Sequence, residues 1–129
     1  MIGKWHLGED CDHQPTGFDF WSVLPGRGDY FDPEMSECAT ETGYKSDIMS
    51  EKSLKWLQKC DPSRPFSLMY HHKAPHREWE PHPNTRHLYT EKIAIPKTFD
   101  DDFCNRGKAA AVAKMRVKCD MTYDDLGLL

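Results

Sequence analysis

The apolar residues between positions 46 and 59 recur at roughly helical spacing, at Ile48, Met49, Leu54 and Leu57. Ser46 can cap such a helix, and the carboxylate of Asp47 suits its positive N-terminal end. Pro62 cannot continue a helix. The pattern therefore predicts a helix from about Ser46 to Lys59.

A short apolar run follows directly after Pro65 and reads Phe-Ser-Leu-Met-Tyr over residues 66–70. Such a run between turn residues is typical of a buried strand. Further on, residues 106–118 contain four alanines and other strong helix formers, which predicts a second helix. Residues 122–126 resemble a capping box at the start of a third helix.

Residues 5–43 contain several glycines and prolines and show no sustained helical or alternating pattern. We expect one long irregular connection there, with a short strand at about residues 18–23. Together these elements predict an α/β chain with two or three strands and two helices.

Composition removes several classes of protein. The chain has 129 residues, which suits one domain, and its net charge of -4 comes with basic residues spread along the sequence. This distribution argues against a nucleic-acid binder, and no apolar run is long enough to span a membrane. The first residues lack the pattern of a signal peptide, and localisation stays unknown. The five cysteines fit no common zinc spacing and leave the redox compartment open.

Five of the seven histidines fall within the segment that follows the predicted strand, at His71, His72, His76, His82 and His87. Residues at the carboxyl end of a strand in an α/β sheet lie at the usual ligand crevice, and histidine exchanges protons near neutral pH. Residue types alone favour a solvated surface loop whose histidines have no function.

Lys4 and His6 occupy alternate positions, so on an extended segment both side chains would project to the same side. A cation beside a proton donor suits an anionic group such as sulfate or phosphate. An ordinary polar strand end is the other interpretation of this short pattern.

Five segments together resemble the type I sulfatases of the alkaline-phosphatase-like superfamily. Residues 3–8 read Gly-Lys-Trp-His-Leu-Gly, residues 17–21 read Gly-Phe-Asp-Phe-Trp, and residues 43–47 read Gly-Tyr-Lys-Ser-Asp. Residues 65–79 contain His-His-Lys-Ala-Pro-His, similar to the active-site loop of bacterial polysaccharide sulfatases, and residues 98–103 read Thr-Phe-Asp-Asp-Asp-Phe. The segments follow the order of the family along nearly the whole chain.

This resemblance implies part of an α/β/α sandwich and the hydrolysis of sulfate esters in sulfated glycans. The family uses a formylglycine nucleophile, made from Cys or Ser, and a calcium ion. Matched by position, Lys4 would hold the sulfate, His6 would orient the formylglycine hydroxyl, and His76 would protonate the departing oxygen. Lys73 would lie at the rim of the pocket and bind anionic substrate.

The same resemblance indicates that residues 1–129 are the central portion of a sulfatase catalytic domain. The nucleophile motif of relatives lies upstream of the segment matched by residues 3–8. Their calcium ligands and second active-site Lys lie outside the matched segments, so neither cofactor is expected to be complete here. Residues 60–64 read Cys-Asp-Pro-Ser-Arg and satisfy the minimal nucleophile pattern. However, a strand is predicted after Cys60 where relatives begin a helix, so Cys60 is not expected to be the nucleophile.

Three functions remain open from the sequence. The first is sulfuric ester hydrolysis by the parent domain, with the 129-residue chain itself expected to be inactive. The second is a non-catalytic chain that binds sulfated polysaccharide or a partner. The third is a phosphohydrolase or phosphonate hydrolase of the same superfamily, against which Trp5 and the Ala-Pro-His sequence favour the sulfatase interpretation.

Overall fold

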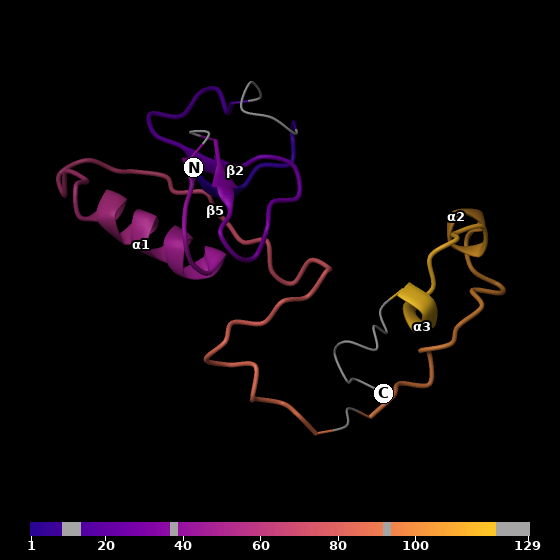
Figure 1. Ribbon diagram of the computed structural model, residues 1–129. Helices are drawn as coiled ribbons and strands as arrows, with labels where there is room; N and C mark the ends of the chain where they lie inside the picture. Colours follow the sequence, from indigo (N-terminus) through magenta and orange to yellow (C-terminus); the bar gives the residue numbers. More distant parts are fainter. Residues whose placement is uncertain (9–13, 37–38, 92–93, 121–129) are drawn as a thin grey trace. The chain divides into compact units, whose positions relative to one another are not determined.

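The computed structural model describes residues 1–8, 14–36, 39–91 and 94–120 (Figure 1). The chain divides into two compact units, Met1–His82 and Pro83–Leu129, which are described separately. No helix among the described residues is long and apolar enough to cross a membrane.

The first unit is built on three parallel strands. Strand β1 (Ile2–Lys4) is central, with β2 (Ser22–Leu24) on one side and β5 (Tyr70–His71) on the other. Ile2 lies opposite Ser22 in β2 and opposite Tyr70 in β5. Because all three strands run in the same direction, their carboxyl ends share one edge of the sheet.

Helix α1 (Lys45–Leu57) packs beside this sheet (Figure 1). Its residue Met49 is fully buried and joins Ile2, Leu24 and Met35 in the core. The helix predicted over residues 46–59 is therefore confirmed, but Ser46 is not its cap. The capping position falls on Tyr44, whose side chain makes no capping hydrogen bond, and Ser46 lies in the first turn.

A small antiparallel pair, β3 (Glu34–Met35) and β4 (Ala39–Thr40), lies within the segment predicted to be irregular. Ser36 links it to the sheet, since its N–H donates to the Val23 carbonyl at 2.7 Å and its hydroxyl accepts from the Val23 N–H at 3.1 Å. Each strand has two residues, too few for an alternating pattern to be visible in the sequence.

The strand predicted over residues 66–70 is observed only as Tyr70–His71. Phe66 and Met69 keep 58% and 46% of their surface exposed, so the prediction of a buried strand is wrong. Within the described residues β5 pairs with β1 alone, and Phe66 instead packs edge-on against Trp56 at 5.4 Å between ring centroids.

The described part of the second unit contains two single-turn helices, α2 (Lys108–Ala111) and α3 (Val117–Asp120). The helix predicted over residues 106–118 is thus interrupted between them. Val112 and Met115, which lie in the interruption, are largely exposed. Alanine propensity alone does not maintain a helix that buries no apolar face. The predicted helix start at residues 122–126 lies outside the described residues.

Candidate anion-binding site

The carboxyl edge of the sheet brings together three segments that are distant in sequence. Lys4 is the last residue of β1, the turn 25–33 follows β2, and the loop 72–82 follows β5. The Trp5 N–H donates to the Leu24 carbonyl at 3.3 Å, and the His71 imidazole lies 3.3 Å from the Lys4 carbonyl oxygen. These contacts hold the ends of β2 and β5, where the two loops begin, beside the end of β1.

Lys73 is held on the turn after β2. Its Nζ donates to the Gly28 carbonyl at 2.6 Å and lies 3.4 Å from the Arg27 carbonyl. The same ammonium lies 4.9 Å from the centroid of the Tyr30 ring, within the range of a cation–π interaction. Two carbonyls and one aromatic face therefore fix a positive charge at this edge.

His76 is connected to the same cluster through its backbone. The Tyr30 hydroxyl donates to the His76 carbonyl at 2.6 Å, and the His76 N–H donates to the Lys73 carbonyl at 2.9 Å. The ring Nδ1 contacts the carbonyl oxygen of Arg77. The two backbone hydrogen bonds therefore hold His76 beside Lys73 and Tyr30.

The pKa of Lys4 shows that these charges act on one another. Burial is the main cause that lowers it from its ordinary value, and repulsion from Lys73 and Arg27 lowers it further. A chain with an overall charge of -4 thus gathers cations at this edge. Such an edge attracts anions.

Lys45 adds a fourth cation that sequence analysis did not identify. It is the first residue of α1 and is 1% exposed, and within the described residues its Nζ has no hydrogen-bond partner. Lys45, Ile48, Met49 and Ser53 are the buried positions of α1. This i, i+3, i+4, i+8 spacing places Lys45 on the inward stripe, which was the available signal.

The structure does not support the side-by-side placement predicted for Lys4 and His6. Strand β1 ends at Lys4, and His6 adopts a left-handed backbone with φ of 55°. Alternation applies only to extended residues, so it does not extend to His6. The His6 side chain is exposed beyond the strand end.

Of the other histidines that follow the predicted strand, several have structural contacts. His82 lies 2.8 Å from the Asp47 carboxylate and packs edge-on against Tyr44 at 4.7 Å between centroids. His72 packs in the same way against Tyr70, and His87 is exposed in the second unit. His76 alone among the five is tied to Lys73 by a hydrogen bond that the structure describes.

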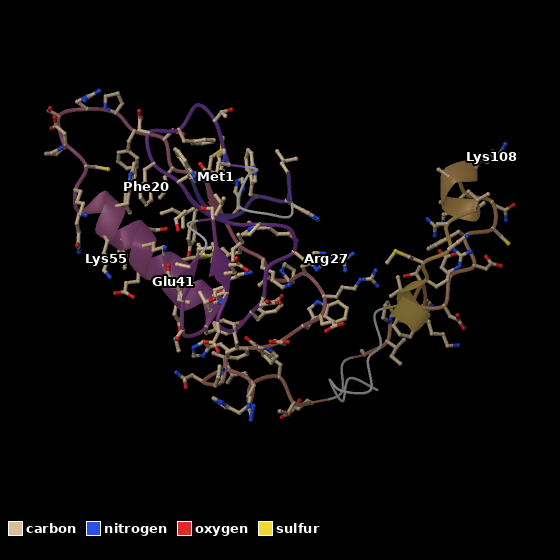
Figure 2. The ribbon with its side chains drawn as sticks, turned by 45° about the horizontal axis from the view of Figure 1, so that its top comes forward. Met1, Phe20, Arg27, Glu41, Lys55 and Lys108 are labelled. Atoms are coloured by element: carbon tan, nitrogen blue, oxygen red, sulfur yellow. The ribbon has the colours of Figure 1, made fainter. Side chains whose placement is uncertain are left out.

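Cys60 lies at the other end of the sheet from Lys4. It lines a hollow together with Met1, Phe20 and Met69, which precede the three strands. Figure 2 shows Met1 and Phe20 close together, with Arg27 apart from them. Cys60, the cysteine that the structure describes in the first unit, thus lies away from the cation cluster. Nowhere in the described ranges do three His, Cys, Asp or Glu side chains gather as a metal site.

Comparison with known proteins finds sulfatase relatives of this chain, although no family model matches it. An N-acetylglucosamine-6-O-sulfatase of Bacteroides thetaiotaomicron is 42% identical over 137 aligned positions, which cover 100% of this chain and 24% of that protein. A solved structure, BT4656 in complex with its substrate D-glucosamine-2-N,6-O-disulfate, superimposes with a TM-score of 0.77 at 39% identity.

This chain is homologous to part of a sulfatase. The solved sulfatase matches 95% of this chain, and the match confirms the partial α/β fold predicted from the sequence. The chain spans about a quarter of the length of both relatives, at 24% and 26%.

Proposed function

We propose that this chain supplies the sulfate-binding part of a sulfuric ester hydrolase that acts on sulfated glycans containing glucosamine. The observation that carries the proposal is the convergence of Lys4 and Lys73 at the carboxyl edge, with His76 tied to the same cluster. The relatives add support, since one is named an N-acetylglucosamine-6-O-sulfatase and the other holds a disulfated glucosamine.

Each proposed residue has a distinct task. Lys4 binds the sulfate and stabilises the charge that grows on its oxygens as the sulfur–oxygen bond breaks. Lys73, at the rim, binds an anionic group of the substrate. His76, with both ring nitrogens protonated, gives one proton to the departing sugar oxygen, which would otherwise leave as an unfavourable alkoxide. His6 is proposed to hold the nucleophile's hydroxyl.

The family's calcium and formylglycine do not fit the described residues. No carboxylate cluster approaches Lys4 in the ranges that the structure describes, and Cys60 lies at the opposite end of the sheet. Residues 1–129 are accordingly proposed to be the central portion of the catalytic domain. Other parts of that domain would supply the nucleophile and the metal ligands.

A second function, binding of sulfated polysaccharide without turnover, is favoured by the position of Cys60. A chain that holds the cations without a nucleophile beside them binds the ester and leaves it intact. The two functions share the same anion site and differ only in whether product forms.

One experiment separates them. Glucosamine 6-sulfate is titrated into the chain by calorimetry, and release of sulfate from an aryl sulfate is followed in parallel. Lys73→Met is expected to weaken binding about tenfold, because one charge-assisted contact is lost. The control is Lys55→Met, which removes an exposed cation that pairs with Glu51 on α1. Both functions require the chain to bind, so no binding refutes both. The same assay on a domain that also carries the nucleophile separates them, because release of sulfate there supports the hydrolase and binding without release supports the second function.

A further inference from the structure

Lys45 has no role in the sulfate site proposed above. Its Nζ lies directly beneath the turn after β2, because a Cβ added at Gly28 would come within 2.7 Å of it. The carbonyl of that same glycine accepts the 2.6 Å hydrogen bond from Lys73. The buried ammonium of Lys45 and the half-exposed ammonium of Lys73 therefore both lie next to Gly28.

The charges that face Lys45 come from three other segments. Lys4 at the end of β1 and Lys73 in the loop after β5 both repel its ammonium, and Asp29 in the turn after β2 attracts it. Burial is the largest cause, and together these groups lower the pKa of Lys45 from 10.5 to about 7. Near neutral pH the side chain thus exchanges between its charged and neutral forms.

We propose that Lys45 is the proton-linked cation of the anion site, and that an anion bound by Lys4 and Lys73 draws a proton onto the Lys45 amine. The inference rests on the proposed sulfate-binding function and adds a regulation to it. A sulfate ester is ionised at all pH values near neutrality and has no proton to give. The proton that accompanies its binding is taken from the solvent.

The direction of the linkage follows from charge. A bound sulfate partly cancels the repulsion from Lys4 and Lys73, so it favours the ammonium form and raises the pKa of Lys45. Linkage is reciprocal, and the protonated form therefore binds the anion more tightly. Affinity falls as the pH rises above 7, by up to tenfold per pH unit while the linkage is complete, and is constant at pH values where Lys45 is already protonated.

The Gly28 turn separates the Lys45 ammonium from the proposed anion. Since Nζ has almost no exposed surface, the anion does not touch Lys45 directly and feels it through the thin turn. Lys45 is a positioning charge in this scheme rather than a group that contacts substrate. The same burial keeps the charge poorly screened by salt, which makes its effect on the anion larger than that of an exposed lysine.

The test follows the titration of individual lysines by NMR, with carbon-13 at the side-chain Cε. The full chain is titrated in sodium sulfate and, as a control, in sodium chloride at equal ionic strength. The Lys45 resonance is assigned by its absence in Lys45→Met, a substitution expected to fold because it removes a buried charge. Lys55, on the exposed face of α1, is the internal control.

We expect the pKa of Lys45 to rise by at least half a unit in sulfate relative to chloride, while that of Lys55 does not move. Sulfate that shifts the Lys4 and Lys73 resonances but leaves the Lys45 titration unchanged would overturn the proton linkage and leave the sulfate site standing. Sulfate that shifts none of the three would overturn both. A Lys45 that titrates near 10.5 in chloride would overturn the linkage as well.

Discussion

The phenolic hydroxyl of Tyr30 donates a 2.6 Å hydrogen bond to the backbone carbonyl oxygen of His76, 46 positions further along the chain. The ring of the same tyrosine lies under the Lys73 ammonium. Tyr30 thus contacts two proposed functional residues, His76 through its hydroxyl and Lys73 through the face of its ring. This arrangement makes Tyr30 the support of the loop after β5.

Tyr30→Phe tests that support. The substitution keeps the ring under Lys73 and removes the hydroxyl, so we expect a loss of about 1 kcal/mol of unfolding free energy. Hydrogen exchange at the His76 amide should accelerate. Tyr44→Phe is the matched control, because the Tyr44 hydroxyl donates to the Glu80 carbonyl at 2.9 Å in the same loop. It should lose similar stability without changing exchange at His76, and equal exchange in both variants would contradict the assignment.

Gly3→Ala is expected to disrupt the sheet. Gly3 has φ of +112° in the central strand, and an added Cβ would overlap the His71 carbonyl. Backbone strain and a clash with backbone atoms should together lower the unfolding free energy by more than about 3 kcal/mol. Thermal unfolding measures this.

Gly17→Ala separates strain from overlap. Gly17 also has a positive φ, of +81°, but nothing lies within 4 Å of its added Cβ. Only the backbone cost of about 1 kcal/mol should remain. Equal losses at the two glycines would show that close packing at the β1–β5 contact is not what requires Gly3.

The charges around Lys45 can be removed one at a time, with opposite expected signs. Lys73→Met removes a repelling ammonium and should raise the pKa of Lys45, whereas Asp29→Asn removes an attracting carboxylate and should lower it. Carbon-13 titration of Lys45 reads both. Shifts of the same sign in the two variants would show that altered burial, rather than charge, controls this lysine.

The stability of the chain should depend on Lys45 in alkaline solution. The unfolded chain holds this proton up to about its ordinary value of 10.5, whereas the folded chain releases it near 7. The unfolded state therefore binds more protons between these values, and the unfolding free energy should rise with pH there. The largest slope for one group is about 1.4 kcal/mol per pH unit.

Denaturant unfolding between pH 7 and 9.5, with and without Lys45→Met, measures this dependence. The slope should be smaller in the variant, and the variant should be the more stable protein at pH 7, where removal of a buried charge relieves its desolvation. Lys55→Met serves as the control and should keep the original slope. Parallel curves for the chain and for Lys45→Met would disprove the assignment.

The sequence predicted α1, although only Ile48 and Met49 of its apolar positions face the core, while Leu54 and Leu57 are exposed. It failed for β5, since an apolar run such as residues 66–69 indicates burial only when something covers it. The antiparallel pair β3 and β4 was missed for a different reason. Its position depends on the link between Ser36 and Val23, which is a tertiary contact with no local signature.

The sequence identified some residues of the candidate site and missed others. Lys4, Lys73 and His76 were singled out from short motifs, and the structure ties Lys73 and His76 to one cluster and couples Lys4 electrostatically to Lys73. Tyr30 and Lys45 were missed because a tyrosine in a turn and a lysine at a helix start are unremarkable locally. Their importance comes from what the fold places above them, namely Lys73 and Gly28.

The buried amino terminus has a practical consequence. Met1 is 5% exposed, and its ammonium group donates a 2.6 Å hydrogen bond to the Phe20 carbonyl. A peptide N–H at this position can donate to the same carbonyl, because the bond needs one proton on the nitrogen and not a free ammonium. Residues joined ahead of Met1 can therefore keep this link between the start of β1 and the segment that leads into β2.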